Sequence, residues 1–321
     1  MNKIILLLWV PFFGMSSIAH SDPPKKKVIK AAYLGHSLSD GIPEMLWGMA
    51  KSTRADTFSF THQRSSGAPL RHQWNQFVVS EGRDLSEHTD LEMMRIFNNA
   101  DIDKSAHLGP FFDQRDGLPS GRYTHLVMTE SVPRYYSEGW GNVVQHTYPY
   151  VDSIYQYARK YNPEIKPYLY EVWHCINSGT PTGCAHDKDA APFRKRLKND
   201  LPMWESVVNQ FNSKNPRQRM QLIPVGQGLG LLSDAIDRGD VPGIGSIKEM
   251  FTDDIHVNDT LRYFAACIHY AVLFEKSPVG LPGELQHLDG RPFVKLSSKM
   301  AAILQRLAWQ TVVGYRETKR K

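Results

Sequence analysis

Short apolar stretches alternate with amphipathic stretches along most of this chain. Five apolar stretches bounded by glycine, proline or polar residues predict strands, and helical apolar spacing between and after them predicts helices. The predicted strands cover residues 28–36, 56–63, 124–131, 167–174 and 219–230. The predicted helices cover residues 41–51, 147–161, 193–212, 259–274 and 298–315. This order predicts an α/β fold, a three-layer α/β/α arrangement around a mostly parallel sheet of about five strands.

Two long polar and aromatic segments, 78–121 and 175–192, interrupt this pattern and are predicted to be loops. In parallel sheets the loops after strand ends build the ligand site, so these segments are expected to shape a cleft. The chain contains no internal repeat, low-complexity block or evident linker. A single domain over residues 22–321 is therefore predicted.

The first 21 residues have the pattern of a secretory signal peptide. Lys3 precedes an apolar stretch, and Ala19-His20-Ser21 forms a small-residue exit, so residues 1–21 are predicted to be removed on export. A retained membrane anchor is the alternative, but Pro11 and Gly14 break the apolar stretch. The mature protein is expected in a periplasm or outside the cell, with no membrane span after signal cleavage.

Composition adds little to this picture. Hydrophobic residues make up 41% of the chain and charged residues 22%, values that are ordinary for globular proteins. The net charge of +5 comes partly from Lys25, Lys26, Lys27 and Lys30, and no nucleic-acid-binding motif accompanies them. No nucleic-acid partner is predicted, and the sequence makes no prediction about oligomeric state.

Two of the three cysteines bracket a short loop that can bend back on itself. Cys175 and Cys184 enclose two glycines and a proline, which favours a disulfide in an oxidising compartment. The alternative is a metal site that includes the neighbouring His174 and His186, but the spacing matches no standard zinc pattern. No metal is predicted, and Cys267, in an apolar helix, is expected to be a buried thiol.

The first predicted strand ends in Gly-His-Ser and passes directly into a helix. A serine at such a position is commonly a helix cap, so Ser37 needs a chemical partner before it can be read as a nucleophile. Asp253 and His256, three residues apart, precede the last but one predicted helix. Histidine can remove the serine proton, and a carboxylate fixes its tautomer. The sequence therefore predicts Ser37 as nucleophile, His256 as general base and Asp253 as its orienting acid.

These motifs resemble the SGNH/GDSL hydrolase superfamily over residues 28–275. Residues 35–38 match the first family block, a Gly-x-Ser, and residues 253–256 match the last block, D-x-x-H. Residues 66–69 occupy the place of the second block, whose glycine contributes a backbone N–H to the oxyanion hole. The resemblance implies a flavodoxin-like architecture, no cofactor, and an oxyanion hole that includes the backbone N–H groups of Ser37 and Gly67. The G-x-S-x-G elbow of the other common serine hydrolase fold is absent.

The third block departs from the family pattern. The family carries an asparagine whose side-chain amide binds the oxyanion, whereas this chain reads Met128-Thr129-Glu130-Ser131. A glutamate accepts hydrogen bonds unless it is protonated. Either a protonated Glu130 completes the oxyanion hole, or Thr129, Ser131 or backbone donors do so.

Exported members that resemble this pattern often remove acetyl or similar acyl groups from sugars. The expected activity is hydrolysis of acyl esters, with a small molecule or a polysaccharide as substrate. Loop arginines that could bind an acidic sugar are Arg64, Arg71 and Arg134, and aromatic residues that could stack on sugar rings are Trp74, Tyr135, Tyr136, Trp140 and Trp173. The competing interpretation places the arginines on the solvated surface and about half of the aromatics in the core. Two other functions remain open: an O-acetyltransferase acting on an exopolysaccharide, and a non-catalytic glycan-binding protein.

Overall fold

The computed structural model describes most of the chain from Lys26 onward. The described residues are 26–53, 55–65, 67–71, 73–74, 94–98, 117–131, 143–180 and 191–319, with only the backbone at 65, 94–98 and 143–146. The predicted signal peptide, 1–21, lies outside these ranges, so export remains a prediction. Arg134, Tyr135, Tyr136 and Trp140 also lie outside them.

A six-stranded sheet with the order β3-β2-β1-β4-β5-β6 forms the centre of the fold. The strands are β1 (Lys27–Gly35), β2 (Asp56–Ser65), β3 (Met94–Asn98), β4 (His125–Thr129), β5 (Lys166–Tyr170) and β6 (Gln221–Ile223). β1, β2, β4, β5 and β6 run parallel to their neighbours, while β3 pairs antiparallel with β2 at one edge. The predicted mostly parallel sheet is confirmed.

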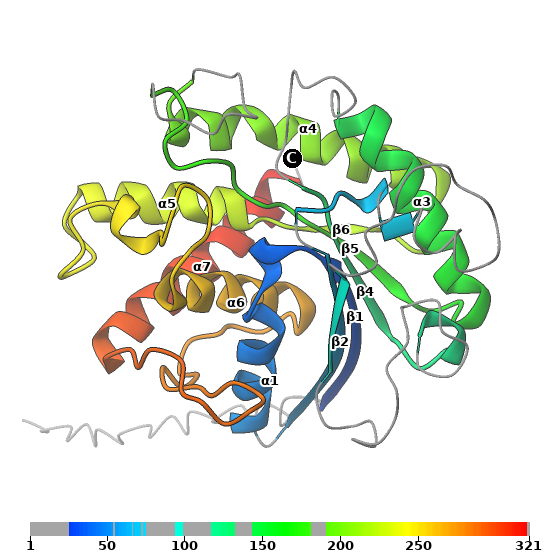
Figure 1. Cartoon of the computed structure of the whole chain (residues 1–321), viewed down its shortest axis with the longest axis horizontal. Coiled ribbons are helices and arrows are strands. Elements are labelled where there is room, and N and C mark those ends of the chain that lie inside the picture. Colours follow the sequence, from blue (N-terminus) through cyan, green and yellow to red (C-terminus); the bar gives the residue numbers. More distant parts are fainter. Residues whose placement is uncertain are drawn as a thin grey trace, which may run out of the picture.

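Helices cover both faces of this sheet and make it the middle of three layers (Figure 1). They are α1 (Ile42–Ser52), α3 (Val143–Tyr161), α4 (Phe193–Lys214), α5 (Val225–Asp237), α6 (Asp259–Leu273) and α7 (Ser298–Thr318). α3 packs against α4 on one face, and α1, α6 and α7 form a contiguous layer on the other. All five predicted helices are present, which confirms the three-layer fold.

Burial on both faces explains why these strands read as continuous apolar runs rather than alternating ones. All five residues of β4 are buried, as are the last five of β1. A parallel strand covered by helices on both sides has no solvent-facing side, so its sequence loses the period of two. The core is one continuous cluster that links the sheet to both helical layers.

The prediction of a strand over 219–230 is wrong beyond its first residues. β6 ends at Ile223, and α5 begins two residues later. Glycines in this helix allow close packing: a Cβ on Gly226 would lie 2.8 Å from Glu171 Oε1, and one on Gly228 would lie 2.4 Å from Ile268 Cδ1. Glycine disfavours helix formation in isolation, so tertiary packing stabilises a helix that local propensity does not predict.

The prediction of a loop over 78–121 also needs correction. β3, at Met94–Asn98, lies within this segment and pairs with β2 from Thr61 to Ser65. A five-residue edge strand needs little apolar periodicity, because pairing on one side and not burial on both faces defines it. The sequence pattern therefore carried no clear signal for β3.

The strand order places a crevice at the carboxyl end of β1. The chain leaves β1 to form β2 on one side of it, and the next parallel strand, β4, lies on its other side. This reversal of strand order is the topological switch point at which open α/β sheets bind ligands. Ser37 lies two residues beyond the last residue of β1, Gly35.

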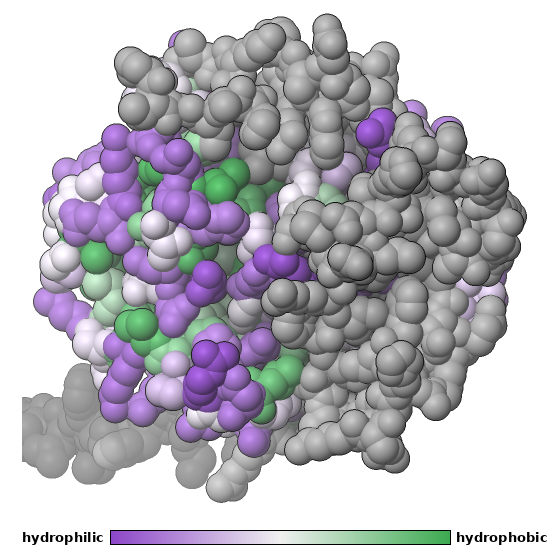
Figure 2. Space-filling model, viewed as in Figure 1, coloured by the Kyte–Doolittle hydropathy of each residue, from purple (hydrophilic) through white to green (hydrophobic). Residues whose placement is uncertain are grey.

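The described surface offers only isolated apolar side chains. Figure 2 shows hydrophilic and hydrophobic residues interspersed over the described part of the viewed face. The exposed large hydrophobic residues come from four separate segments: Val28, Tyr161, Val279 and Val294. Among the described helices, none combines the length and hydropathy needed to cross a membrane.

The cysteine predictions are resolved in part. Cys267 is a buried free thiol in α6, as expected, and burial raises its pKa. Cys175 is also buried, but Cys184 and His186 lie outside the described residues. The disulfide between Cys175 and Cys184 therefore remains a prediction. His174 is buried and packs edge-on against Phe193. Within the described ranges no group of three or more His, Cys, Asp or Glu side chains could hold a metal ion.

Candidate active site

The turn after β1 presents Ser37 at the start of a short 3-10 helix. A Cβ on Gly35 would lie 2.3 Å from Ser39 Oγ, so the tight turn requires glycine there. The 3-10 helix covers Ser37–Ser39, and His36 caps it by accepting the Leu38 N–H at Nδ1 (3.4 Å). The turn therefore fixes the Ser37 backbone independently of any cap formed by the serine side chain.

His36 connects this turn to the neighbouring strand. Because Nδ1 accepts a hydrogen bond, Nε2 carries the proton and donates to the carbonyl oxygen of Glu130 (2.9 Å). Both residues are buried. The x position of the Gly-x-Ser motif thus links the turn that holds Ser37 to the carboxyl end of β4.

A second tight turn holds the acid and the base. Asp253 Oδ1 accepts the backbone N–H groups of Ile255 (2.8 Å) and His256 (2.7 Å). Thr252 N–H donates to the His256 carbonyl (2.8 Å) and closes the base of the turn. The D-x-x-H segment is therefore folded by its own carboxylate, which leaves Oδ2 available to the imidazole.

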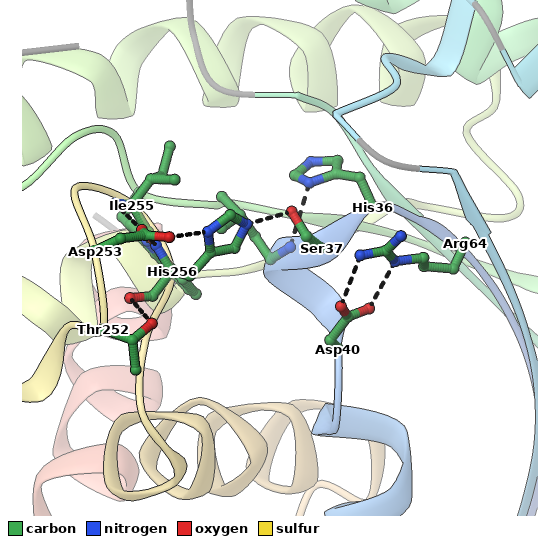
Figure 3. A network of polar contacts seen from close by, with 10 residues as sticks. His36, Ser37, Asp40, Arg64, Thr252, Asp253, Ile255 and His256 are labelled. Atoms are coloured by element: carbon green, nitrogen blue, oxygen red, sulfur yellow. Dashed lines mark hydrogen bonds and ion pairs between the residues drawn. The ribbon is translucent and has the colours of Figure 1, made fainter. Parts of the chain in front are cut away.

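Ser37, His256 and Asp253 form one line of hydrogen bonds. His256 Nε2 lies 2.8 Å from Ser37 Oγ, and His256 Nδ1 lies 2.7 Å from Asp253 Oδ2 (Figure 3). Ser37 and His256 are separated by 219 positions in the sequence and meet at the carboxyl end of β1. The imidazole is 39% exposed and the carboxylate 54% exposed, so the line is open to solvent.

Electrostatics favour the ionised form of Asp253. Partial burial opposes ionisation, but the N–H groups of His256 and Ile255 together with the His256 ring outweigh it and hold the carboxyl pKa below its usual range. An ionised Asp253 accepts Nδ1–H and leaves the Nε2 lone pair facing the serine hydroxyl. This is the arrangement in which the imidazole can take the serine proton.

The loop after β5 holds the D-x-x-H turn in place. Trp173 Nε1 donates to the Ile255 carbonyl (2.7 Å), Ile176 N–H donates to the Asp254 carbonyl (2.8 Å), and Asn177 Nδ2 donates to Asp254 Oδ1 (2.5 Å). Trp173 is 0% exposed. The prediction that Trp173 contacts substrate is therefore corrected, because its ring is enclosed and its N–H donates to the D-x-x-H turn.

Replacing Trp173 with phenylalanine is expected to lower kcat about five- to twentyfold and to cost about 1–2 kcal/mol of unfolding free energy. The ring stays apolar, but the Ile255 carbonyl loses its donor and the turn gains freedom. Steady-state kinetics and urea denaturation check both values. Trp204→Phe, at another fully buried tryptophan in α4, serves as control and should lose stability with kcat unchanged. Equal losses of kcat in both variants would contradict a local positioning role.

Gly67 and Ser37 both follow the carboxyl ends of neighbouring parallel strands, β2 and β1. Gly35, the last residue of β1, is paired with Arg64 of β2. Gly67 comes three residues after Arg64, just beyond the end of β2. Its φ is +61°, a left-handed conformation that favours glycine. This conformation orients the backbone of the loop after β2, and the N–H groups of Gly67 and Ser37 remain the predicted oxyanion donors.

Glu130 organises this loop rather than donating to an oxyanion. Its Oε1 accepts the backbone N–H groups of Leu70 (3.2 Å) and Ser131 (2.7 Å), and Oε2 bonds the Thr147 hydroxyl (2.7 Å). Burial raises its pKa to about 7 despite these hydrogen bonds, which act in the opposite direction. The prediction that Glu130 contributes to the oxyanion hole is corrected, because its carboxyl is fully engaged by the protein.

Thr129 and Ser131 were the other predicted donors to the oxyanion, and the Ser131 backbone N–H already donates to Glu130. The Thr129 hydroxyl is buried and has no hydrogen-bond partner among the described residues. Backbone donors therefore remain the assigned contributors, and no third donor is identified.

Glu130→Gln is expected to retain most activity, while Glu130→Ala loses at least about tenfold in kcat. Glutamine can accept both backbone N–H groups through Oε1 and donate to Thr147, whereas alanine leaves those donors unpaired. Initial-rate assays of both variants check this pair. Comparable rates in Glu130→Ala and the wild type would contradict the organising role.

The same substitution also tests the buried charge. The Glu130 carboxyl has a pKa of about 7 in the folded protein and about 4.5 in the unfolded chain. Because the unfolded chain loses this proton first, the free energy of unfolding falls as pH rises from 4.5 to about 7. The glutamine variant lacks this titration. Its stability relative to the wild type is therefore expected to rise by about 3 kcal/mol across that window, measured by urea denaturation at several pH values. A pH-independent difference would contradict the raised pKa.

The remaining predicted substrate-binding residues have protein partners of their own. Arg64 makes a bidentate ion pair with Asp40 (3.1 and 3.2 Å), which follows the nucleophile turn (Figure 3). Trp74 is half-buried and packs edge-on against Tyr157 of α3. Both side chains therefore have partners within the protein, and a contact of Arg64 or Trp74 with substrate remains a prediction. Arg71 is half-buried, and Arg134 lies outside the described residues.

Comparisons with known proteins give a fold and no family. No family model matches the chain, and no curated protein matches its sequence. Among solved structures, a DUF4886 family protein from Bacteroides uniformis aligns with a TM-score of 0.56 and 14% identity, over 89% of this chain and 95% of that one. A candidate GDSL-like lipase from Parabacteroides merdae aligns with a TM-score of 0.45 and 12% identity, over 78% of this chain and 98% of that one. The first likeness supports the overall fold.

Proposed function

We propose that this chain is a serine esterase that hydrolyses acyl esters. The observation that carries the proposal is the continuous line from Asp253 through His256 to Ser37, with contacts of 2.7 and 2.8 Å. Hydrogen-bond geometry of this kind activates a hydroxyl that is otherwise a poor nucleophile. The proposed roles are nucleophile for Ser37, general base and acid for His256, and orienting carboxylate for Asp253.

The reaction proceeds in two halves. Ser37 Oγ attacks the ester carbonyl carbon while its proton passes to His256 Nε2, and the carbonyl oxygen becomes an oxyanion bound by the N–H groups of Ser37 and Gly67. The tetrahedral intermediate collapses, the C–O bond to the alcohol breaks, and His256 gives its proton to the departing oxygen. Water then attacks the acyl-serine, giving its proton to His256, which returns it to Ser37 as the carboxylic acid leaves. No step needs a metal or an organic cofactor.

The proposed substrate is an acetylated carbohydrate outside the cytoplasm. Two sequence features support this choice: the predicted signal peptide and the resemblance to exported members of the SGNH superfamily. The exposure of His256 and Asp253 is also compatible with a bulky substrate such as a glycan chain.

A panel of nitrophenyl esters and acetylated glycans tests this function. Short acyl chains such as acetate should be hydrolysed in preference to octanoate, and acetate should be released from an acetylated polysaccharide. Adding an unacetylated acceptor glycan separates hydrolysis from acetyl transfer, because a transferase would move the acyl group to that acceptor. Glycan binding without hydrolysis of any ester in the panel would contradict the esterase and favour a binding protein.

A further inference from the structure

The outer edge of β6 is only partly protected. Because Ile223 O accepts the Glu171 N–H, the backbone groups of Gln221 and Ile223 face β5, and those of Met220 and Leu222 face away from the sheet. The Asn212 side chain substitutes for a missing strand at Met220, accepting its N–H (2.7 Å) and donating to its carbonyl (3.2 Å). In the part of the chain that the structure describes, no such side chain engages the outward backbone groups of Leu222.

A cavity of about 470 Å³ lies against this edge and is lined by residues of α4, β6 and α7. Val208, Val272 and Val312 provide an apolar lining, together with Leu222 of β6 itself. The volume is in the range of small-ligand pockets, and none of the triad residues lines it. The cavity is therefore a site separate from the proposed active site.

The rim of this cavity carries an excess of positive charge. Arg219, Arg316 and Lys319 face one acid, Glu205, which already pairs with Lys319 (2.6 Å). Arg219 and Arg316 have no ion-pair partner among the described residues. Two guanidinium groups thus line a cavity whose wall is partly apolar, an arrangement that suits a carboxylate attached to an apolar body.

We propose that this cavity binds a short peptide or acylated amino acid that ends in a free carboxylate. Its amide group would pair with the backbone of Leu222 as an added strand does, its apolar side chains would contact the three valines, and its carboxylate would bind Arg219 and Arg316. The proposal does not depend on the esterase activity.

The probe is N-acetyl-Leu-Leu, compared with the same molecule carrying a C-terminal amide, by isothermal titration calorimetry on the full chain. The carboxylate form is expected to bind with a dissociation constant below about 1 mM, and the amide form at least about tenfold more weakly. The double variant R219Q/R316Q should remove this preference for the carboxylate. Asn209→Trp, an exposed cavity-wall position on α4, should block both probes without removing charge.

Arg306→Gln provides the matched control, since Arg306 is exposed on α7 and does not line the cavity. It should bind both probes as the wild type does. The proposal is overturned if the wild type binds neither probe, if carboxylate and amide bind equally, or if R219Q/R316Q keeps the preference. Ester hydrolysis should be unchanged in all these variants, which separates this site from the proposed catalytic function.

Discussion

Replacing Ser37 with alanine is expected to lower kcat for ester hydrolysis by about 10⁵- to 10⁶-fold. The variant loses the only atom that forms the acyl-enzyme, while His256 and the backbone donors remain in place. The residual rate should come from substrate binding and oxyanion stabilisation. Hydrolysis of nitrophenyl acetate, with circular dichroism to verify folding, measures the effect.

Ser39→Ala is the matched control for this prediction. Ser39 lies in the same 3-10 turn, but its hydroxyl is buried and bonds the His36 carbonyl (2.6 Å) and His62 Nε2 (2.9 Å). Its removal should change kcat by less than about tenfold, because it affects the turn and not the nucleophile. A Ser37→Ala variant that hydrolyses esters as fast as Ser39→Ala would remove Ser37 from the mechanism.

Replacing Asp253 with asparagine is expected to lower kcat by about 10³- to 10⁴-fold. The amide oxygen can still accept the N–H groups of Ile255 and His256, so the turn should stay folded. The amide nitrogen would then face His256 Nδ1 and favour the tautomer that is protonated at Nε2, which cannot take the serine proton. Steady-state kinetics measure the loss, and thermal denaturation shows whether the fold is retained.

Asp254→Asn is the neighbouring control. Asp254 holds Asn177 through its side chain and Ile176 through its carbonyl, so the substitution leaves the acid–base pair intact. Its kcat should fall by no more than about threefold. Similar losses at both positions would mean that the turn needs its negative charge in general, and that Asp253 does not specifically orient His256.

The regular elements of the fold were predictable because burial leaves a periodic pattern. The helix at Asp259–Leu273 shows helical apolar spacing, whereas the strand at His125–Thr129, buried on both faces, was recognisable as a short continuous apolar run between polar segments. α5 was not predictable, since the glycines that admit Glu171 and Ile268 lower its helix propensity. β3 was missed because pairing with β2, between 29 and 37 positions away in the sequence, defines it.

The hydrogen-bonded line from Asp253 through His256 to Ser37 was predictable for a different reason. Ser37 and the D-x-x-H turn are short local motifs at strand-to-helix junctions, and a parallel sheet brings such junctions to one edge. The groups that position them carry no local signal. Trp173 and Glu130 act through backbone atoms of segments 82 and 60 positions away, so residue type alone suggested other roles for them.

The prediction of substrate-binding side chains relied on residue type and proximity to strand ends. An arginine near a strand end can bind an anionic substrate or an acid of its own chain, and here Arg64 pairs with Asp40. A tryptophan in a loop can stack on a sugar or fill the core, and Trp173 is enclosed. Only the three-dimensional contacts distinguish these outcomes.

Labelling with a fluorophosphonate probe tests the central claim most directly, since it reports an activated serine without knowledge of the substrate. Folded wild-type protein is expected to be labelled at Ser37, as mapped by peptide mass spectrometry, and Ser37→Ala and His256→Ala are both expected to lose the label. A folded wild type that resists the probe, or labelling that persists in His256→Ala, would contradict a nucleophile activated by the Asp253–His256 pair.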